Sequence, residues 1–435
     1  MKKAVVWLLT LVLVFGSVSV FAEKEKDEPE ISSVSAILMQ EGTGRIMYEK
    51  NADKKVYPAS TTKVMTAMLA IEKLDPAQTL TASEAAVQID RDGSNMGILR
   101  GETFTVEQLL YGLLLHSAND AANVLAEGVS GSISAFVELM NQRAAEIGMK
   151  NSHFMNAHGY HDPEHYTTAR DMLILCTKAM ESDLFRKIVA TPQYEIPPTA
   201  LYEEPRILSS NNSLLNPMKG HAYLYNGAKG IKTGHTSDAG YCLTSYAERG
   251  GLGYFCVTMN GQYEYPDNES FIDTIKLFNY GFKSFALKNV ADVNEIVATH
   301  DVKWAKGGDQ AVLSAKAPLA VLLPKEYDKA LLTTEITMEE NIKAPVKKGD
   351  VLGKIEYFYD GESVGCVELV AAKNVSRSFL IMIFGTLWNL IFNVWVMTPL
   401  TLVVIVLLLR RTAEMKRKQR AREKQRENFR RELNR

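Results

Sequence analysis

Three short motifs in this chain combine side chains that can carry out acyl transfer on a serine. They are Ser60-Thr-Thr-Lys63, Ser117-Ala-Asn119 and Lys232-Thr-Gly234, in that order. A serine hydroxyl is a weak nucleophile until a neighbouring base removes its proton, and a neutral lysine amine can be that base in place of histidine. One such match carries little weight, but three in this order predict a serine/lysine acyl-transfer centre.

The first motif supplies a nucleophile and a base. We expect Ser60 at the start of a helix, where backbone N–H groups stabilise negative charge, with Lys63 one turn later on the same face. An exposed lysine is protonated at neutral pH, so its use as a base requires burial and a second cation, which Lys232 can provide. Taken alone, the pair would be read as a helix cap and a solvent-facing lysine.

The second motif lies between two predicted helices. The Ser117 hydroxyl can relay a proton to a leaving amine, and the Asn119 amide can bind a ligand carbonyl and Lys63. Two other segments, Ser209-Ser-Asn211 and Ser210-Asn-Asn212, match the same pattern. Ser117 is preferred because it follows an apolar helix that can bury its backbone near the site.

The third motif suits a strand edge that pairs with an extended peptide. Lys232 would supply positive charge, Thr233 a hydroxyl for a carboxylate, and Gly234 room for close approach. An ordinary turn is the alternative for this motif by itself.

A cluster of metal-ligating residue types occupies one further segment. Its members are His158, His161, Asp162, Glu164 and His165. Gly159 and Pro163 make the segment a loop, so its ligands do not share a helix face. We therefore expect loop hydrogen bonds here and not a metal site.

The ends of the chain predict export and a membrane anchor. Residues 1–22 have a lysine-led apolar run and small residues before Glu23, typical of a secretory signal peptide, and 23–32 are expected to be a flexible leader. Residues 379–409 have no ionisable side chain and exceed the roughly 20 residues that cross a bilayer. The alternatives are an interfacial position for the first part of this segment and a buried core helix for the whole.

The tail, 410–435, contains twelve Lys and Arg against four Glu, a net charge of +8, whereas the whole chain carries −2. A basic tail beside a span is expected on the cytoplasmic side, with the preceding domains outside the cell membrane. The remainder of the chain is acidic, so a nucleic-acid partner is not expected. Four cysteines are too few for a disulfide framework, and we expect them to be reduced and buried.

The remaining pattern predicts two folded domains, residues 33–287 and 288–375. In the first, apolar spacing and turn residues predict strands and helices alternating along the chain. The expected strands are 35–39, 45–48, 241–247 and 253–259. One helix is expected to start near Ser60, and four further helices are expected over 106–115, 120–127, 133–147 and 273–285. In the second, short apolar runs separated by glycine and charged turns predict a small β domain.

Several of these segments together resemble the low-molecular-mass penicillin-binding proteins, the D-alanyl-D-alanine carboxypeptidases. The resemblance rests on Asn51–Ala67, His158–Asp171, Gly230–Cys242 and two segments of the β domain, Val346–Gly353 and Val370–Val375. It implies an α/β (α+β) catalytic domain with an antiparallel sheet between helices, followed by a small all-β domain.

The resemblance also implies a reaction. Ser60 would attack the penultimate D-Ala carbonyl of a peptidoglycan stem peptide with Lys63 as base, terminal D-Ala would leave, and water would release the acyl group. The N–H groups of Ser60 and His235 would form the oxyanion hole, and Thr236 would help to bind the substrate carboxylate. Penicillins and other β-lactam antibiotics would acylate the same serine, and no cofactor is needed.

One departure from the family pattern leaves alternatives open. Members typically carry an arginine for the substrate carboxylate after the second hairpin, but residues 260–271 contain neither arginine nor lysine. Thr233, Thr236 and Lys232 could suffice, or the protein could be a scaffold that acylates slowly and turns over poorly. A β-lactamase is disfavoured because no clear Glu-x-x-x-Asn element supplies a deacylation base.

Overall fold

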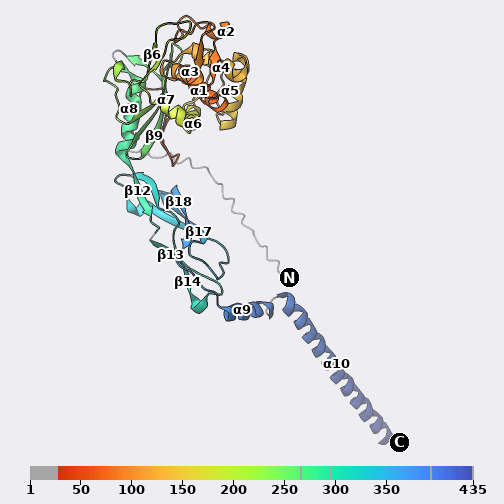
Figure 1. The fold of residues 1–435 in the computed structure, drawn as a ribbon. Coiled ribbons are helices and arrows are strands. Elements are labelled where there is room, and N and C mark those ends of the chain that lie inside the picture. Colours follow the sequence, from red (N-terminus) through yellow and green to blue (C-terminus); the bar gives the residue numbers. More distant parts are fainter. Residues whose placement is uncertain (1–27, 265–266, 294, 392–393, 434–435) are drawn as a thin grey trace, which may run out of the picture. The chain divides into compact units, whose positions relative to one another are not determined.

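The computed structural model describes residues 28–264, 267–293, 295–391 and 394–433 (Figure 1). The chain divides between Ala286 and Leu287 into two compact units, one residue from the domain boundary expected from the sequence. The predicted signal peptide, 1–22, lies outside the described residues.

The first unit is built on a five-stranded antiparallel sheet with the order β2-β1-β9-β8-β7. Both predicted hairpins are confirmed, since β1 pairs with β2 and β8 with β9. β9 is buried along nearly its whole length because helices cover both faces of the sheet. The strands are β1 (Ser35–Gln40), β2 (Ile46–Lys50), β7 (Ala228–Thr236), β8 (Gly240–Arg249) and β9 (Leu252–Gly261).

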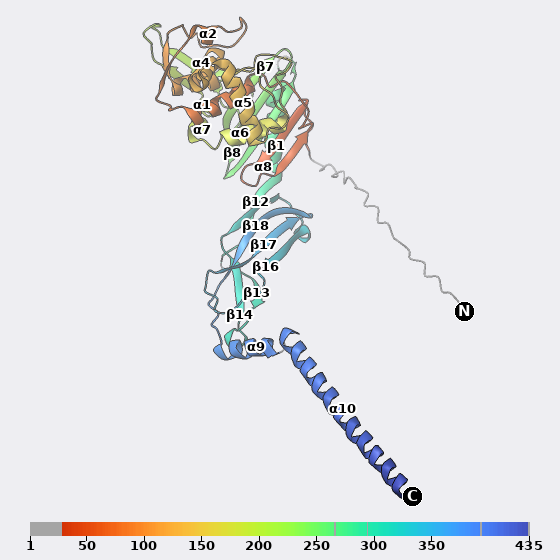
Figure 2. The same cartoon turned by 90° about the vertical axis from the view of Figure 1, so that its right-hand side faces the viewer.

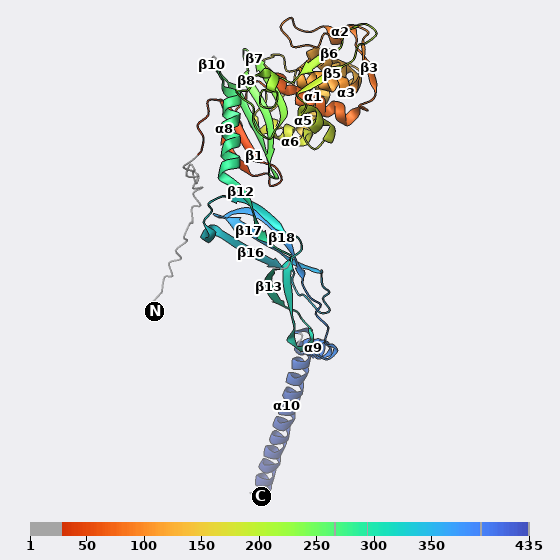
Figure 3. The same ribbon diagram turned by 60° about the vertical axis from the view of Figure 1, so that its left-hand side comes forward.

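Helices lie on the two faces of this sheet (Figures 2 and 3). α8 (Glu269–Ser284) packs against β1, β8 and β9, and α6 (Ala169–Ala179) packs against the same strands from the other face. Behind α6, α1 (Lys63–Lys73) is surrounded by other helices, and its residues 63–70 are all buried. The other helices of this unit are α2 (Glu84–Val87), α3 (Val106–Leu115), α4 (Asn119–Ser130), α5 (Ile133–Ile147) and α7 (Asp183–Val189).

Three short strand pairs complete the first unit. They are β3 (Thr79–Thr81) with β4 (Thr103–Thr105), β5 (Gln193–Ile196) with β6 (Arg206–Ser209), and β10 (Tyr263–Glu264) with β11 (Asp267–Asn268). The first two pairs lie at the edge of the helical layer that contains α3 and α4.

Local capping explains most helix boundaries. Thr105 and Gln108 form a reciprocal capping box at the start of α3, and Ser132 and left-handed Gly148 bound α5. The predicted helices 106–115 and 133–147 are therefore confirmed. α8 begins at Glu269, earlier than predicted, because the Asn268 side chain accepts a hydrogen bond from the Ser270 N–H and caps it.

The prediction that a helix starts at Ser60 is wrong by three residues. Ser60 lies in a 3₁₀ turn, Ala59–Thr62, and α1 begins at Lys63. The Thr61 N–H and hydroxyl both donate to the Pro58 carbonyl, which closes this tighter turn.

The leader is also shorter than expected. Residues 23–27 lie outside the described part, but Ile31 is buried and the Ser32 N–H donates to the buried Asp273 carboxylate at 3.0 Å. Ser33 donates to the same carboxylate through its N–H and its hydroxyl, both at 2.7 Å. A buried carboxylate needs such donors, so Asp273 fixes the chain from Ser32 onward.

The second unit is the predicted small β domain. Its five-stranded antiparallel sheet has the order β13-β14-β18-β17-β16, and β12 pairs with β15. Its core is formed by apolar residues of β12, β14, β17 and β18 together with apolar residues of the connecting segments. The strands are β12 (Phe285–Ala291), β13 (Ile296–Asp301), β14 (Gln310–Ala315), β15 (Leu319–Pro324), β16 (Leu332–Met338), β17 (Val351–Tyr359) and β18 (Glu362–Ala371).

The four cysteines are free thiols. Cys176, Cys242 and Cys256 are buried as expected, whereas Cys366 is exposed on β18. The expectation of burial is wrong for Cys366 because β18 belongs to a small sheet, where alternate residues along a strand face solvent.

The predicted membrane segment, 379–409, contains α9 (Phe379–Ile391) and the first part of α10 (Val394–Leu433). Among the helices in the described part of the chain, none is both long enough and apolar enough to cross a membrane.

Candidate active site

The turn that carries Ser60 is held by two glycines from distant segments. Ala59 has a left-handed backbone, with φ of 48°, and is buried. A Cβ on Gly159 would lie 1.9 Å from the Ala59 carbonyl oxygen, and a Cβ on Gly234 would lie 3.0 Å from the Ser60 nitrogen. Both positions need glycine because their backbones touch the backbone of the nucleophile turn. At Gly234 the structure shows an approach of β7 to the Ser60 turn, whereas the sequence predicted room for a bound ligand, and Gly159 was not foreseen.

Replacing Gly234 with alanine should slow acylation. The new methyl group would also lie 3.0 Å from the Pro58 oxygen and the Thr61 nitrogen, so the Ser60 turn or β7 must shift. A shift of this kind in a reacting group can cost about 10²-fold. We expect the second-order rate constant for penicillin acylation to fall by about that factor.

Gly128→Ala is the matched control for Gly234→Ala. Its methyl group would meet the Leu80 side chain at 2.5 Å, away from the site, so we expect lower thermal stability and an unchanged acylation rate. Unchanged acylation by a folded Gly234→Ala variant would contradict the predicted role of this contact.

Lys63 meets Ser60 at the beginning of α1. Its Nζ lies 2.9 Å from Ser60 Oγ and donates to the His158 carbonyl oxygen at 2.7 Å. A neutral amine that donates one hydrogen to His158 can accept the Ser60 proton on its lone pair. The predicted serine–lysine contact is confirmed, and these two partners occupy the amine in place of the expected contact with Asn119.

The surroundings of Lys63 favour the neutral amine. Its side chain has no exposed surface. Burial lowers its pKa well below the usual value, the charge of Lys232 lowers the pKa further, and Asp120 opposes both effects. These effects favour the unprotonated amine that a base requires.

Lys232 lies on β7, at the edge of the sheet among the described strands. Only 1% of it is exposed, and its Nζ donates to the Thr233 carbonyl oxygen at 2.8 Å. Burial lowers its pKa to about 7. The predicted second cation is thus present near Lys63, and its own charge depends on pH in the neutral range.

These two pKa shifts predict a bell-shaped pH dependence for acylation. The rate should rise as pH passes the lowered pKa of Lys63, because only the deprotonated amine accepts the serine proton. The rate should fall above a pH of about 7, because deprotonated Lys232 no longer attracts the carboxylate of a substrate or penicillin. Penicillin acylation rates measured against pH test this, and Lys232→Met should lose the alkaline limb. If the alkaline limb persists in this variant, the titration of a group other than Lys232 causes it.

The segment between α3 and α4 carries the second motif. Ser117 is buried with φ of 66°, and Asn119 is the first residue of α4. The Asn119 N–H donates to the Ser94 carbonyl oxygen at 2.8 Å, and the Ala118 N–H donates to Gly112. We call residues 117–119 the Ser117 corner.

The helix that ends at this corner, α3, packs against β7. Burial lowers the pKa of His116, and the charges of Lys219 and Lys232 contribute. Of the competing serines, Ser209 is the last residue of β6 and Ser210 begins the loop that follows, in which Asn216 donates a hydrogen bond to Ser209. In that loop the Asn211 N–H donates to the Leu115 carbonyl oxygen, so the loop supports the end of α3 that leads to the Ser117 corner.

Asp120 is a member of the site that the motifs did not indicate. It is buried, and its carboxylate accepts hydrogen bonds from the N–H groups of Met96, Ile98 and Ala121. Its charge raises the pKa of Lys63. Its place immediately after Asn119 is the signal that could have identified it.

The histidine loop, residues 158–165, makes hydrogen bonds, as the sequence predicts. His165 Nδ1 accepts from the Met155 N–H at 3.2 Å, so Nε2 carries the proton and donates to Thr62 Oγ1 at 2.9 Å. His158 contributes its carbonyl oxygen to Lys63, and burial lowers the pKa of its ring to about 3. The loop thus contacts the Ser60 turn at Ala59 and Thr62, and the beginning of α1 at Lys63.

The other predicted residues of β7 lie at its end. The Thr236 hydroxyl accepts from the Ala239 N–H at 3.0 Å, which leaves its proton for a ligand oxygen. His235 is exposed, and its ring lies 4.1 Å from that of Tyr241. The turn after β7 approaches the histidine loop, since His161 Nδ1 lies 3.7 Å from Asp238.

Comparison with known proteins identifies the family. Residues 22–263 match the family model described as D-alanyl-D-alanine carboxypeptidase. The chain belongs to this carboxypeptidase family. Residues 285–377 match a second model, the C-terminal domain of penicillin-binding protein 5, which agrees with the small β domain.

Curated relatives of this carboxypeptidase family cover nearly the same length. The D-alanyl-D-alanine carboxypeptidase DacF of Bacillus subtilis is 30% identical over 380 residues, which span 85% of this chain and 94% of DacF. DacC of Escherichia coli is 29% identical, over 88% of this chain and 94% of DacC.

A solved structure supports the same assignment. Penicillin-binding protein 5 of Haemophilus influenzae has a TM-score of 0.63 at 27% identity, covering 80% of this chain and 99% of that one. The expected α/β catalytic domain with an antiparallel sheet between helices and the expected C-terminal β domain are confirmed.

Proposed function

We propose that this protein is a serine-type D-alanyl-D-alanine carboxypeptidase that removes the terminal D-alanine from peptidoglycan stem peptides. The observation that carries this is the contact between Ser60 Oγ and the fully buried Lys63 amine, 2.9 Å apart, within the family's catalytic domain. Ser60 attacks the penultimate carbonyl as Lys63 takes its proton, and the acyl-enzyme forms as D-alanine leaves. Water then hydrolyses the ester.

The other site residues have predicted roles in this cycle. The N–H groups of Ser60 and His235 bind the oxyanion. Ser117 passes a proton to the leaving amine, and Asn119 binds the substrate carbonyl. Lys232, Thr233 and Thr236 bind the terminal carboxylate, with Gly234 allowing β7 to lie against the Ser60 turn. β-Lactams acylate Ser60 by the same steps.

The test measures two products in parallel. Purified protein should release D-alanine from a stem-pentapeptide mimic, and a fluorescent penicillin should label a peptide that contains Ser60. Labelling without D-alanine release would support the slow-turnover scaffold instead, and rapid nitrocefin turnover would support a β-lactamase.

We further propose that residues 379–409 anchor the protein in the cell membrane, with the catalytic domain outside the cytoplasm and the tail, 410–435, inside. Support comes from α10, where the large apolar side chains between Leu400 and Leu409 are 46% to 62% exposed, an arrangement that is unfavourable in water. Arg410, Arg411 and the basic tail follow this stretch directly, as expected for a cytoplasmic flank.

Cys366 provides a native reporter for this topology because it is the exposed cysteine and the others are buried. A membrane-impermeant maleimide should label Cys366 in intact cells. In a Cys366→Ser background, Ala421→Cys should be labelled only after the cells are opened. Labelling of the tail cysteine in intact cells would refute the proposed orientation, and recovery of the full chain in the soluble fraction would refute the anchor.

A further inference from the structure

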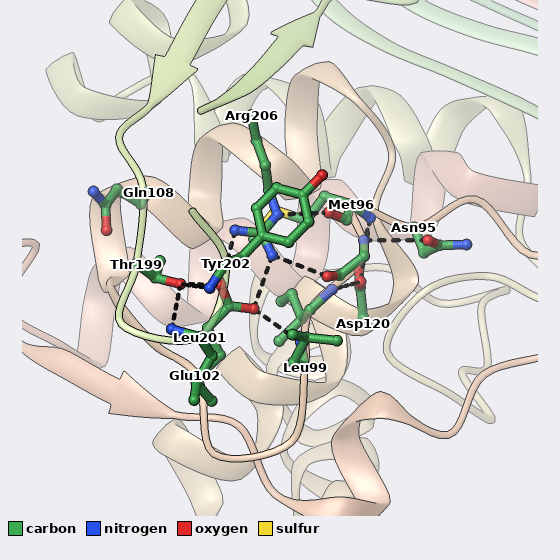
Figure 4. A network of polar contacts seen from close by, with 12 residues as sticks. Asn95, Met96, Leu99, Glu102, Gln108, Asp120, Thr199, Leu201, Tyr202 and Arg206 are labelled. Carbon is green, nitrogen blue, oxygen red and sulfur yellow. Dashed lines mark hydrogen bonds and ion pairs between the residues drawn. The ribbon is translucent and has the colours of Figure 1, made fainter. Parts of the chain in front are cut away.

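A buried ion pair lies in two segments that carry none of the predicted site residues (Figure 4). Arg206, at the start of β6, contacts Glu102, which precedes β4. Arg206 Nη1 lies 2.8 Å from Glu102 Oε1, and Nη2 donates to Oε2 at 2.9 Å. The Glu102 side chain has no exposed surface and that of Arg206 is 7% exposed. A buried ion pair often adds little net stability, so the other contacts of this pair indicate what it does.

The pair binds the backbone of one loop at three points. Arg206 Nε donates to the Met96 carbonyl oxygen and Nη2 to the Gly97 carbonyl oxygen, both at 3.0 Å. Glu102 Oε2 accepts from the Leu99 N–H at 2.9 Å. The Tyr202 ring covers the guanidinium at 4.3 Å, and Thr199 donates to Glu102. We call residues 94–99 the bracing loop.

The Ser117 corner and the residue after it bind the same loop. Asp120 accepts from the N–H groups of Met96 and Ile98, at 3.2 and 3.0 Å. The Asn119 N–H donates to the Ser94 carbonyl oxygen at 2.8 Å. At Met96, therefore, the carbonyl oxygen is bound by Arg206 and the N–H by Asp120, as Figure 4 shows.

We propose that the Arg206–Glu102 pair is a positioning element for the Ser117 corner and acts through the bracing loop. The pair fixes the carbonyl oxygens of Met96 and Gly97. The N–H groups of Met96 and Ile98, which belong to the same loop, are then held in place to bind Asp120. Because Asp120 lies in the first turn of α4, this turn is held in place as well. The pair touches no reacting group. This inference rests on the proposed acyl transfer, in which Ser117 and Asn119 serve the substrate.

The test removes both charges together, because loss of Arg206 alone would leave Glu102 buried and unpaired. In the full chain, Arg206→Met with Glu102→Gln should slow acylation by a fluorescent penicillin about tenfold or more, since displaced catalytic groups lose rate steeply. The final stoichiometry should remain one label per chain. A loss of folded protein would lower that stoichiometry, whereas mispositioning lowers only the rate.

A double-mutant cycle separates positioning from a general structural effect. When Ser117→Ala and Asn119→Ala are both present, the paired Arg206 and Glu102 changes should alter the residual acylation rate by less than about twofold, because the corner has no side chains left to misplace. An equal loss of rate in both backgrounds would overturn the inference, and so would an unchanged rate in the otherwise wild-type chain.

Two further variants complete the experiment. Arg100→Ala removes an exposed ion pair with Glu84 beside the bracing loop and should leave the rate unchanged. If the double substitution does not fold, Arg206→Lys keeps a charge beside Glu102 but cannot reach both carbonyl oxygens, and an unchanged rate in this variant would also overturn the inference. If the wild-type chain takes up no penicillin, the proposed function itself fails. A labelled wild type with unaffected variants refutes only the positioning role.

Discussion

Ser60→Ala should abolish both penicillin labelling and D-alanine release. The alanine has no oxygen to form the acyl-enzyme, and loss of the nucleophile in a serine peptidase of the Ser-His-Asp type lowers kcat by about 10⁶-fold. The fold should survive, since Ser60 Oγ contacts Lys63 and the amine keeps its bond to the His158 carbonyl. One lost hydrogen bond costs about 1 kcal/mol. Intact-protein mass after penicillin treatment and D-alanine release measure the two effects.

Ser209→Ala is the matched control for this substitution. Ser209 belongs to a Ser-x-Asn pattern, but its hydroxyl accepts a hydrogen bond from Asn216 of the loop that follows β6. Labelling and D-alanine release should therefore stay at the wild-type level. D-alanine release by the Ser60→Ala variant at the wild-type rate would rule out the acyl-enzyme mechanism proposed here.

Lys63→Met should separate activity from stability. Loss of a general base lowers rates by about 10² to 10⁴-fold, and methionine has a similar length without the amine. We expect acylation to fall by this factor while the melting temperature stays level or rises, because a wholly buried amine is replaced by an apolar group. Acylation kinetics and thermal unfolding measure the two quantities.

The pH dependence of unfolding gives this prediction a second readout. The pKa of Lys63 is lowered in the folded state, so the unfolded chain binds an additional proton between that pKa and the usual value near 10.4. Wild-type stability from this group therefore rises with pH across that window, and the advantage of the methionine variant should be largest near neutral pH and shrink toward pH 10. Lys73→Met, on the exposed last turn of α1, should change neither activity nor this difference. An advantage that is independent of pH would contradict the neutral state of Lys63.

The sequence was sufficient to predict the parts of the site that depend on spacing along the chain. Ser60 and Lys63 are three residues apart, and the 3₁₀ turn that leads into α1 brings them together much as a helical turn would. The predicted hairpins and the helices of α3 and α5 follow from periodicity and local caps. The start of α1 was placed wrongly because the 3₁₀ turn depends on the left-handed Ala59, and this conformation is supported by contact with Gly159, a hundred residues away.

The supporting residues could not be predicted in this way. The side chains of Asp120, Glu102 and Arg206 bind backbone N–H and carbonyl groups of the bracing loop. Nearly every residue type has these groups, so the sequence of the loop does not indicate which side chains bind it. The histidine loop was a partial success. Its hydrogen bonds were expected, but the contribution of the His158 carbonyl to Lys63 requires the tertiary fold.

The position of α1 has a consequence for how this enzyme fails. Lys63, the proposed general base, is the first residue of a helix enclosed by other helices, so the lowered pKa of its amine depends on a dry interior. Any loosening of that helix cluster that admits solvent would return the amine to its protonated form before the chain melts. Inactivation by mild denaturant should therefore precede the loss of secondary structure. The loss of activity would then show that water has entered the core of the protein.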